Sequence, residues 1–301
     1  MVVIYHLGWG RLAGLMPFMP AFRRLETEKI VIFYHRGAHP KAFLAMQEVL
    51  PQVEDFHHLK FKHKPELVLC RTQAEMQRLT GTKTRFVTYP VRGRIFASSK
   101  GQDDGLTGTI HLDVYLRHEL SHTILYQNMP GIRFRHFPHW LLEGVATYSA
   151  CQRGVDGYLS REETIAYLQK GYFLDPRDWE QRAFSAGKNS EVMLMPNRIW
   201  FIYSEFATIV EDLVKDFGEE QFIAYLHRLL TGDDHDLVFR EIFQTNFEIF
   251  LERYIRRLDL FTGCFIFQTN FEIFLERYRK YRSLKTTQSA FDHGQEHLEF
   301  G

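Results

Sequence analysis

The segment His118-Glu119-Leu120-Ser121-His122 has the residue types and the spacing of a metal site. On a helix, histidines at positions i and i+4 lie on one face, so both imidazoles can reach a single ion. Glu119 lies one step around that helix, where its carboxylate can take a proton from water held at the ion. Zinc bound in this way lowers the pKa of its water to about 7 and polarises the carbonyl under attack. The motif therefore predicts amide hydrolysis at neutral pH, with Zn2+ as the cofactor.

This chemistry requires the motif to lie on a helix, and the flanking residues indicate one. Apolar residues recur at the spacing of one helical face, at Leu116, Leu120 and Ile124. Asp113 can cap the start of the helix, and Asn128 with Pro130 can end it. The two histidines are thus expected inside a well-delimited helix.

A catalytic zinc site takes three protein ligands and leaves a fourth position for water, so the motif needs one more ligand. Downstream the chain reads Trp140-Leu141-Leu142-Glu143-Gly144-Val145-Ala146-Thr147-Tyr148, a WLxEGxAxY string. HExxH followed by this string resembles the gluzincin metallopeptidases, the thermolysin and zinc aminopeptidase superfamily, and most of all the compact families called peptidase MA-like. In that pattern the glutamate of the second helix is the third zinc ligand, so the resemblance assigns this role to Glu143.

Gly144 follows that glutamate inside the predicted second helix, where glycine costs about 1 kcal/mol relative to alanine. We expect it to let the two ligand helices approach closely. Further along, the segment from Trp200 to Ala207 resembles the aminopeptidase segment whose tyrosine hydroxyl stabilises the tetrahedral oxyanion. The resemblance implies this role for Tyr203, a contribution of roughly 2.7–4 kcal/mol in other enzymes. A tyrosine on an aromatic helix can also be a core residue.

Two departures from the family pattern limit what the resemblance implies. The GxMEN signature with which zinc aminopeptidases bind a free amino terminus is absent before the motif, where the chain reads Arg92 to Ser98. Amino-terminal trimming is therefore not predicted. Thr147 stands where thermolysin-like enzymes carry an acidic residue that orients the first histidine. Which groups would hydrogen-bond the outer nitrogens of the imidazoles and fix their tautomers is therefore left open.

Composition is that of an ordinary globular enzyme, with 301 residues, 45% of them hydrophobic and 25% charged. The formal net charge of zero provides no overall field for nucleic acid or for an acidic membrane surface. The resemblance implies a peptide or protein substrate as the partner. Cys70, Cys151 and Cys264 are widely spaced, which favours a reducing, cytoplasmic compartment over a disulfide framework. The apolar segment 1–24 leaves a membrane anchor as the alternative location.

The pattern of apolar runs and turn residues predicts an α+β protein, a small mixed β-sheet subdomain followed by a mainly helical catalytic subdomain. Four runs read as strands, at 29–35, 66–71, 84–89 and 94–98. A helix is expected from Pro40 to Leu50, where Pro51 interrupts it. Capping boxes at Thr72 and Ser160 open two more, and Gly81 is expected to end the first of these. Residues 99–107 are expected to form a polar loop and 176–197 a long irregular connection, and helices are expected at 199–217 and 219–230.

The carboxy-terminal part contains a repeat, because Ile242–Tyr254 recurs letter for letter as Ile266–Tyr278. The first copy is expected to form the closing amphipathic helix of the domain. Its apolar stripe consists of Phe243, Phe247, Phe250, Leu251 and Tyr254. The second copy is surplus to one domain, which gives a division into segment 1–24, a catalytic domain at 25–258 and a tail at 259–301.

Together these features predict zinc-dependent peptide hydrolysis, with the ion held by His118, His122 and Glu143, Glu119 as general base, and Tyr203 as oxyanion donor. The alternative is a zinc-stabilised binding or structural module of the same fold that processes no substrate. Hydrolysis of a non-peptide amide is also compatible with these residues. Gluzincins bind an extended peptide as an added strand at a sheet edge, but which strand forms that edge, the cleavage preference and the oligomeric state are left open.

Overall fold

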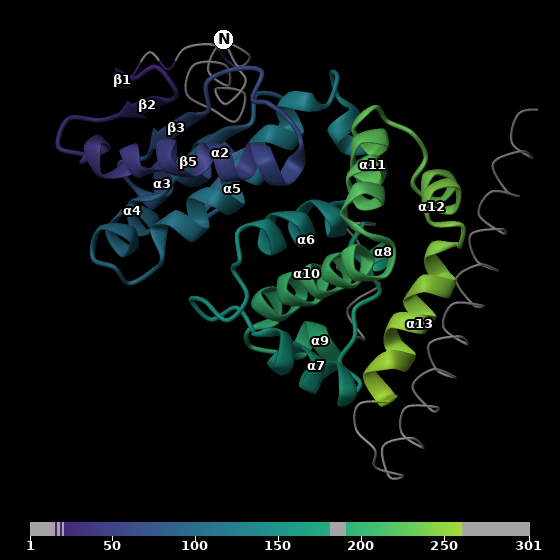
Figure 1. Ribbon diagram of the computed structural model, residues 1–301. Helices are drawn as coiled ribbons and strands as arrows, with labels where there is room; N and C mark the ends of the chain where they lie inside the picture. Colours follow the sequence, from purple (N-terminus) through teal and green to yellow (C-terminus); the bar gives the residue numbers. More distant parts are fainter. Residues whose placement is uncertain (1–15, 17–18, 20, 181–190, 261–301) are drawn as a thin grey trace, which may run out of the picture. The chain divides into compact units, whose positions relative to one another are not determined.

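The computed structural model describes Met16, Met19, residues 21–180 and residues 191–260. Within these ranges the expected α+β class is confirmed, as a small mixed sheet precedes a series of helices (Figure 1). The described chain divides into two compact units. Residues up to Thr164 together with Leu174–Phe247 form the first, and Ile165–Phe173 with the chain from Glu248 onward form the second. Every candidate site residue belongs to the first unit.

The sheet has five strands in the order β1-β2-β3-β5-β4. Their bounds are Arg23–Glu26 for β1, Val31–Tyr34 for β2, Glu66–Leu69 for β3, Phe86–Tyr89 for β4 and Arg94–Ala97 for β5. The three central strands are parallel, whereas β1 and β4 run antiparallel to their neighbours at the two edges. The four predicted strands are confirmed, and β1 is an addition that begins just before the boundary expected at residue 25.

The two faces of the sheet pack against different helices. Side chains alternate along each strand, and one face contributes Val31, Phe33, Val68 and Phe96 to a core cluster with residues of helix α3, Gln73–Thr80. The opposite face carries Thr88, whose hydroxyl contacts Glu119 of helix α5, Leu112–Asn128. The sheet thereby fixes the position of the helix that holds the HExxH motif.

The helix after β2 differs from its expected bounds. A 3-10 helix, Pro40–Ala45, runs into α2, Met46–His57, and Pro51 lies inside α2 instead of interrupting it. Proline at this point removes one backbone hydrogen bond of the helix, and Pro51 lies on its exposed side. On the other side α2 buries Val49, Leu50 and Val53, and this burial offsets the loss.

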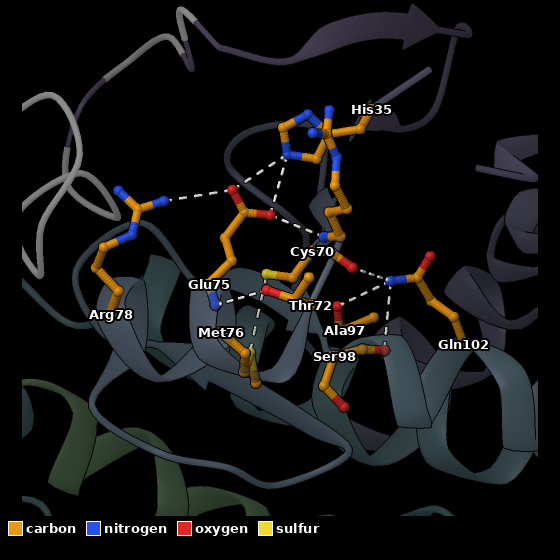
Figure 2. Close-up of polar contacts among 10 residues, drawn as sticks. His35, Cys70, Thr72, Glu75, Met76, Arg78, Ala97, Ser98 and Gln102 are labelled. Atoms are coloured by element: carbon orange, nitrogen blue, oxygen red, sulfur yellow. Dashed lines mark hydrogen bonds and ion pairs between the residues drawn. The ribbon is translucent and has the colours of Figure 1, made fainter. Parts of the chain in front are cut away.

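Helix α3 begins and ends as its sequence predicts. The Thr72 hydroxyl accepts a hydrogen bond from the Glu75 amide, and Gly81 ends the helix in the left-handed conformation (φ 83°). The Glu75 carboxylate accepts from the amide of Arg71 instead of that of Thr72, and it also contacts His35 and Arg78 (Figure 2). The capping motif is therefore extended into a small charged cluster.

The predicted loop at 99–107 is wrong, because Ser99–Leu106 forms helix α4. Ser98 caps it by accepting from the amide of Gly101. Asp104 pairs with Arg85 and Lys100. The side-chain amide of Gln102 donates to the carbonyl of Cys70, just after β3, and to that of Ala97 at the end of β5. Contacts made with distant parts of the chain thus stabilise a helix whose composition is typical of a turn.

Helix α5 has the predicted extent, but Asp113 does not cap it. The residue before the helix is His111, without a side-chain cap, and Asp113 lies in the first turn paired with Arg117. At the other end Asn128 is the last helical residue, and its amide donates to the carbonyls of Ile124 and Lys60. The HExxH motif consequently lies in the middle of a long, mostly buried helix.

The helices that follow include both expected and unexpected elements. Their bounds are Arg133–Arg135 for a 3-10 turn, His139–Ser149 for α6, Arg161–Gln169 for α7, Pro176–Glu180 for α8, Glu191–Leu194 for α9, Arg198–Phe217 for α10 and Glu219–Leu230 for α11. The connection at 176–197, predicted to be irregular, contains α8 and α9, and residues 181–190 between them lie outside the described ranges. The α10 and α11 helices and the capping box at Ser160 are confirmed.

The first copy of the repeat is not one helix. It spans the end of α12, His235–Phe243, and most of α13, Phe247–Leu260, with Gln244 in the left-handed conformation (φ 53°) between them. The expected apolar stripe is nevertheless buried, at Phe243, Phe247, Phe250, Leu251 and Tyr254. The second copy, the rest of the predicted tail from residue 261 onward, and residues 1–15, 17–18 and 20 of segment 1–24 lie outside the described residues. Among the described residues, none of the helices has the length and apolarity needed to cross a bilayer.

Candidate metal centre

Three side chains predicted as metal ligands meet at one point. The Nε2 atoms of His118 and His122 lie 3.1 Å apart. Oε2 of Glu143, on α6, lies 3.5 Å from the first and 3.4 Å from the second. Both histidines are buried, and the Glu143 side chain is 19% exposed. Two imidazole nitrogens and a carboxylate oxygen therefore form a nearly equilateral triangle at the surface of a cavity.

The size of this triangle fits a divalent metal ion. Tetrahedral zinc with ligands at about 2.0–2.1 Å places its donor atoms about 3.3–3.4 Å from one another. The electrostatics agree, because the site favours a positive charge. Burial alone would raise the pKa of the Glu143 carboxyl, but the charge of His122 and hydrogen bonds to both imidazoles hold that pKa well below its ordinary value. Burial disfavours protonation of His122, yet the Glu143 charge raises its pKa.

The outer nitrogens of the two imidazoles are unsupported. Nδ1 of His118 and Nδ1 of His122 are buried and have no hydrogen-bond partner among the residues that the structure describes. Thr147, which occupies the place of the acidic orienting residue in the family pattern, is fully buried, and its hydroxyl is likewise unpartnered within the described ranges. Within the described ranges the two rings therefore have polar partners only on their inner side, at Nε2.

Glu119 is held beside the triangle from the edge of the sheet. Its Oε2 accepts a hydrogen bond from the Thr88 hydroxyl on β4 at 2.6 Å. Its backbone carbonyl lies 3.0 Å from that hydroxyl and 3.0 Å from the hydroxyl of Thr123. Glu119 and Thr88 are each only 6% exposed. The sheet edge thus holds this carboxylate in the pocket that the two histidines also line.

Gly144 does allow a close helix approach, but with a different helix from the one expected. A Cβ atom at Gly144 would lie 2.8 Å from the carbonyl oxygen of Phe206 and 3.1 Å from a methyl group of Val210, both on α10. At Gly144 the close contact is therefore with α10, and the two helices lie side by side (Figure 1). This approach brings the helix that carries Tyr203 up to the helix that carries Glu143.

Tyr203 lies next to the triangle, as predicted. Its ring is parallel to that of His118, at 8° with centroids 6.2 Å apart. Burial raises the pKa of the Tyr203 hydroxyl well above its ordinary value, and the nearby charge of Glu143 adds to this effect. The hydroxyl accordingly stays protonated and can act as a hydrogen-bond donor.

All five candidate residues line one pocket of about 490 Å3. Its walls come from β4, α5, α6, the start of α10 and the segment after α6 that contains Gln152 and Tyr158. The edge strand β4 lines this pocket through Phe86, Val87 and Thr88. Thr88, Gln152 and Tyr158 were not predicted as site residues.

Alternation along the run 84–89 could have placed Thr88 on the buried side of its strand, together with Phe86. Nothing in the local sequence marks Gln152 or Tyr158.

Comparison of the chain with protein-family models and with curated proteins finds no match. The case for a function therefore depends on the geometry of the pocket and on the motif within it.

Proposed function

We propose that this protein is a zinc-dependent peptide hydrolase. The observation that carries the proposal is the triangle formed by His118, His122 and Glu143, with the carboxylate of Glu119 held beside it in the same pocket. A structural zinc site closes its coordination with a fourth protein ligand. Among the described residues only three side chains form the cluster, and a carboxylate suited to proton transfer lies next to it. This arrangement favours catalysis over a purely structural role.

The residues would divide the reaction as follows. A bound zinc ion would supply Lewis acidity, lowering the pKa of water to about 7 and polarising the carbonyl. Glu119 would accept the proton of the attacking water and pass it to the leaving amine. Tyr203 would donate a hydrogen bond to the oxygen that becomes negative in the transition state.

The position of β4 supports an extended peptide as the substrate. An edge strand has backbone N–H and C=O groups that no neighbouring strand pairs, and an extended peptide can add to it as a further strand. Because β4 lines the pocket and carries Thr88, a peptide on this edge would run past Glu119. Backbone pairing of this kind tolerates varied side chains.

Digestion of a mixed peptide library, read out by mass spectrometry, tests the proposal. The zinc-loaded full chain should cleave peptides, and both a chelator and Glu119→Gln should abolish cleavage while the protein stays folded. Zinc bound with no cleavage of any peptide would instead favour the silent zinc-stabilised module. Cleavage that persists in Glu119→Gln would remove the base from the mechanism.

A further inference from the structure

Gln152 is a polar side chain whose burial the fold does not explain. It is fully buried, and neither its amide nitrogen nor its amide oxygen has a hydrogen-bond partner among the described residues. A buried polar group left unpaired costs about 1–3 kcal/mol, and native structures contain few of them. Both unpaired atoms belong to a residue that lines the pocket with the metal triangle.

The backbone around Gln152 holds this side chain in place. The preceding residue, Cys151, has φ 53°, a left-handed conformation that side chains rarely adopt. The backbone N–H of Gln152 donates to the Thr147 carbonyl, and the backbone carbonyl of Gln152 accepts from the N–H of Val155. These bonds close the end of α6 into a tight turn. A left-handed residue at this position is a common way for a helix to end, and the turn fixes the backbone of Gln152.

The rest of this turn is packed against α10. Gly157 has φ 92°, and a Cβ atom there would lie 3.1 Å from the indole ring of Trp200. The amide of Gly154 donates to the carbonyl of Tyr158, which brings Tyr158 back to the pocket. Gln152 therefore lies in a wall of the pocket that is fixed from two sides.

A carboxamide offers two donors on nitrogen and an acceptor on oxygen. The N–H and C=O of one trans peptide group point in opposite directions, but the N–H and C=O of a single residue in an extended peptide point the same way and can pair with both atoms of a carboxamide. We propose that Gln152 binds the backbone N–H and C=O of one substrate residue, outside the peptide bond that is cleaved. This inference rests on the proposed function and adds to it a specific contact beyond the metal and the edge strand.

Two probes separate this inference from the metal site itself. Acetohydroxamate carries a metal-binding group and no further peptide group, whereas an alanine phosphinic tetrapeptide carries uncleaved peptide groups on both sides of its metal-binding group. Calorimetry on the zinc-loaded full chain should show that Gln152→Met, which keeps the shape and removes the amide, weakens phosphinic peptide binding about tenfold, as expected for two lost hydrogen bonds. Acetohydroxamate binding should stay within twofold.

The same variant has a second readout that does not involve a ligand. Because Gln152→Met removes two unpaired buried polar atoms, its melting temperature should be equal to or above that of the wild type. Gln102→Met is the matched control, since the Gln102 amide donates to the carbonyls of Cys70 and Ala97 at 2.7 and 3.2 Å (Figure 2). That variant should melt at a lower temperature and bind both probes normally.

Equal phosphinic peptide affinity in the wild type and Gln152→Met would overturn the inference and leave the proposed function standing. A melting temperature several degrees lower in Gln152→Met, with unchanged peptide affinity, would assign the residue to the fold. A wild-type protein that binds neither probe would overturn the metal centre and this inference together.

Discussion

The hydroxyl of Thr88 lies 2.6 Å from Oε2 of Glu119, so the edge strand of the sheet directly contacts the candidate general base. The same hydroxyl lies 3.0 Å from the backbone carbonyl of Glu119. Both residues are buried. The strand that would bind an extended peptide is therefore also the strand that orients the carboxylate acting on it.

Replacing Thr88 should impair catalysis without removing the metal. A hydrogen bond to a charged group contributes about 1.5–3 kcal/mol, so Thr88→Val should lower kcat by about 10- to 100-fold, with a smaller change in KM and normal zinc content. Thr88→Ser keeps the hydroxyl and should stay within a few-fold of the wild type. Equal kcat in Thr88→Val and Thr88→Ser would show that the contact does not orient the base.

Removal of the Tyr203 hydroxyl tests the oxyanion role. Tyr203→Phe keeps the ring that lies parallel to His118 and should reduce kcat by about 10²–10³ with little change in KM. Tyr158 lines the same pocket, its ring centroid 6.4 Å from that of Tyr203, and Tyr158→Phe is the matched comparison. Were the large loss of kcat to appear in Tyr158→Phe alone, the donor would be Tyr158.

Gly144 should not tolerate a side chain, because backbone atoms of α10 occupy the space. Gly144→Ala would place Cβ 2.8 Å from the Phe206 carbonyl oxygen, and we expect a loss of about 1–3 kcal/mol in the free energy of unfolding measured with urea. Gly105, inside α4, faces only the flexible side chain of Leu112, and Gly105→Ala should be neutral or stabilising by up to about 1 kcal/mol. Similar stability in the two variants would argue against the close approach of α6 and α10.

A buried histidine behind the motif should make stability depend on pH. His57 is fully buried, its Nδ1 lies 2.8 Å from the Val53 carbonyl, and its Nε2 lies 2.8 Å from the Ser121 hydroxyl. The carbonyl can only accept, so Nδ1 donates and Nε2 accepts from Ser121. Burial lowers the pKa of His57 from its ordinary 6.5 to about 4. The folded protein therefore holds the neutral imidazole where the unfolded chain would bind a proton.

Between the two pKa values the unfolded state binds more protons than the folded state. The contribution of His57 to the free energy of unfolding is therefore complete above pH 6.5 and is lost as the pH falls towards 4. At pH 5 the loss from this residue should be about 2 kcal/mol relative to pH 7.5. Urea unfolding with a chelator present should show this decrease in the wild type and much less of it in His57→Gln. His58→Asn, at the exposed neighbour, should keep the decrease. The same decrease in His57→Gln would assign it to other groups.

The candidate site could be predicted from the sequence where its geometry is local. Residues at i and i+4 of a helix share a face whatever surrounds them, so His118 and His122 converge as expected. The position of Glu143 depends on two helices meeting, and only a longer string of residues indicated it. Thr88 and Gln152 reach the pocket through the packing of a strand and a turn, and their spacing from the motif carries no such information.

The fold shows the same limit. Helix α3 was predicted to its last residue because its cap, Thr72, and its stop, Gly81, act within a few residues. Helix α4 was missed because its glycines and polar residues resemble a loop. The ion pair that helps to stabilise it joins Asp104 to Arg85, a residue far away in the sequence. Pro51 was read as a break, since the burial that keeps α2 continuous is a property of the folded chain.

The most direct test of the account is the zinc content of purified protein measured by mass spectrometry for three forms. The wild type should contain close to one zinc ion per chain, Glu143→Ala should lose the metal because one of its three ligands is gone, and Glu119→Gln should keep it because that residue lies beside the triangle without belonging to it. Circular dichroism should show that all three are folded. Zinc retained undiminished in Glu143→Ala, or absent from the folded wild type, would contradict the metal centre on which the proposed function depends.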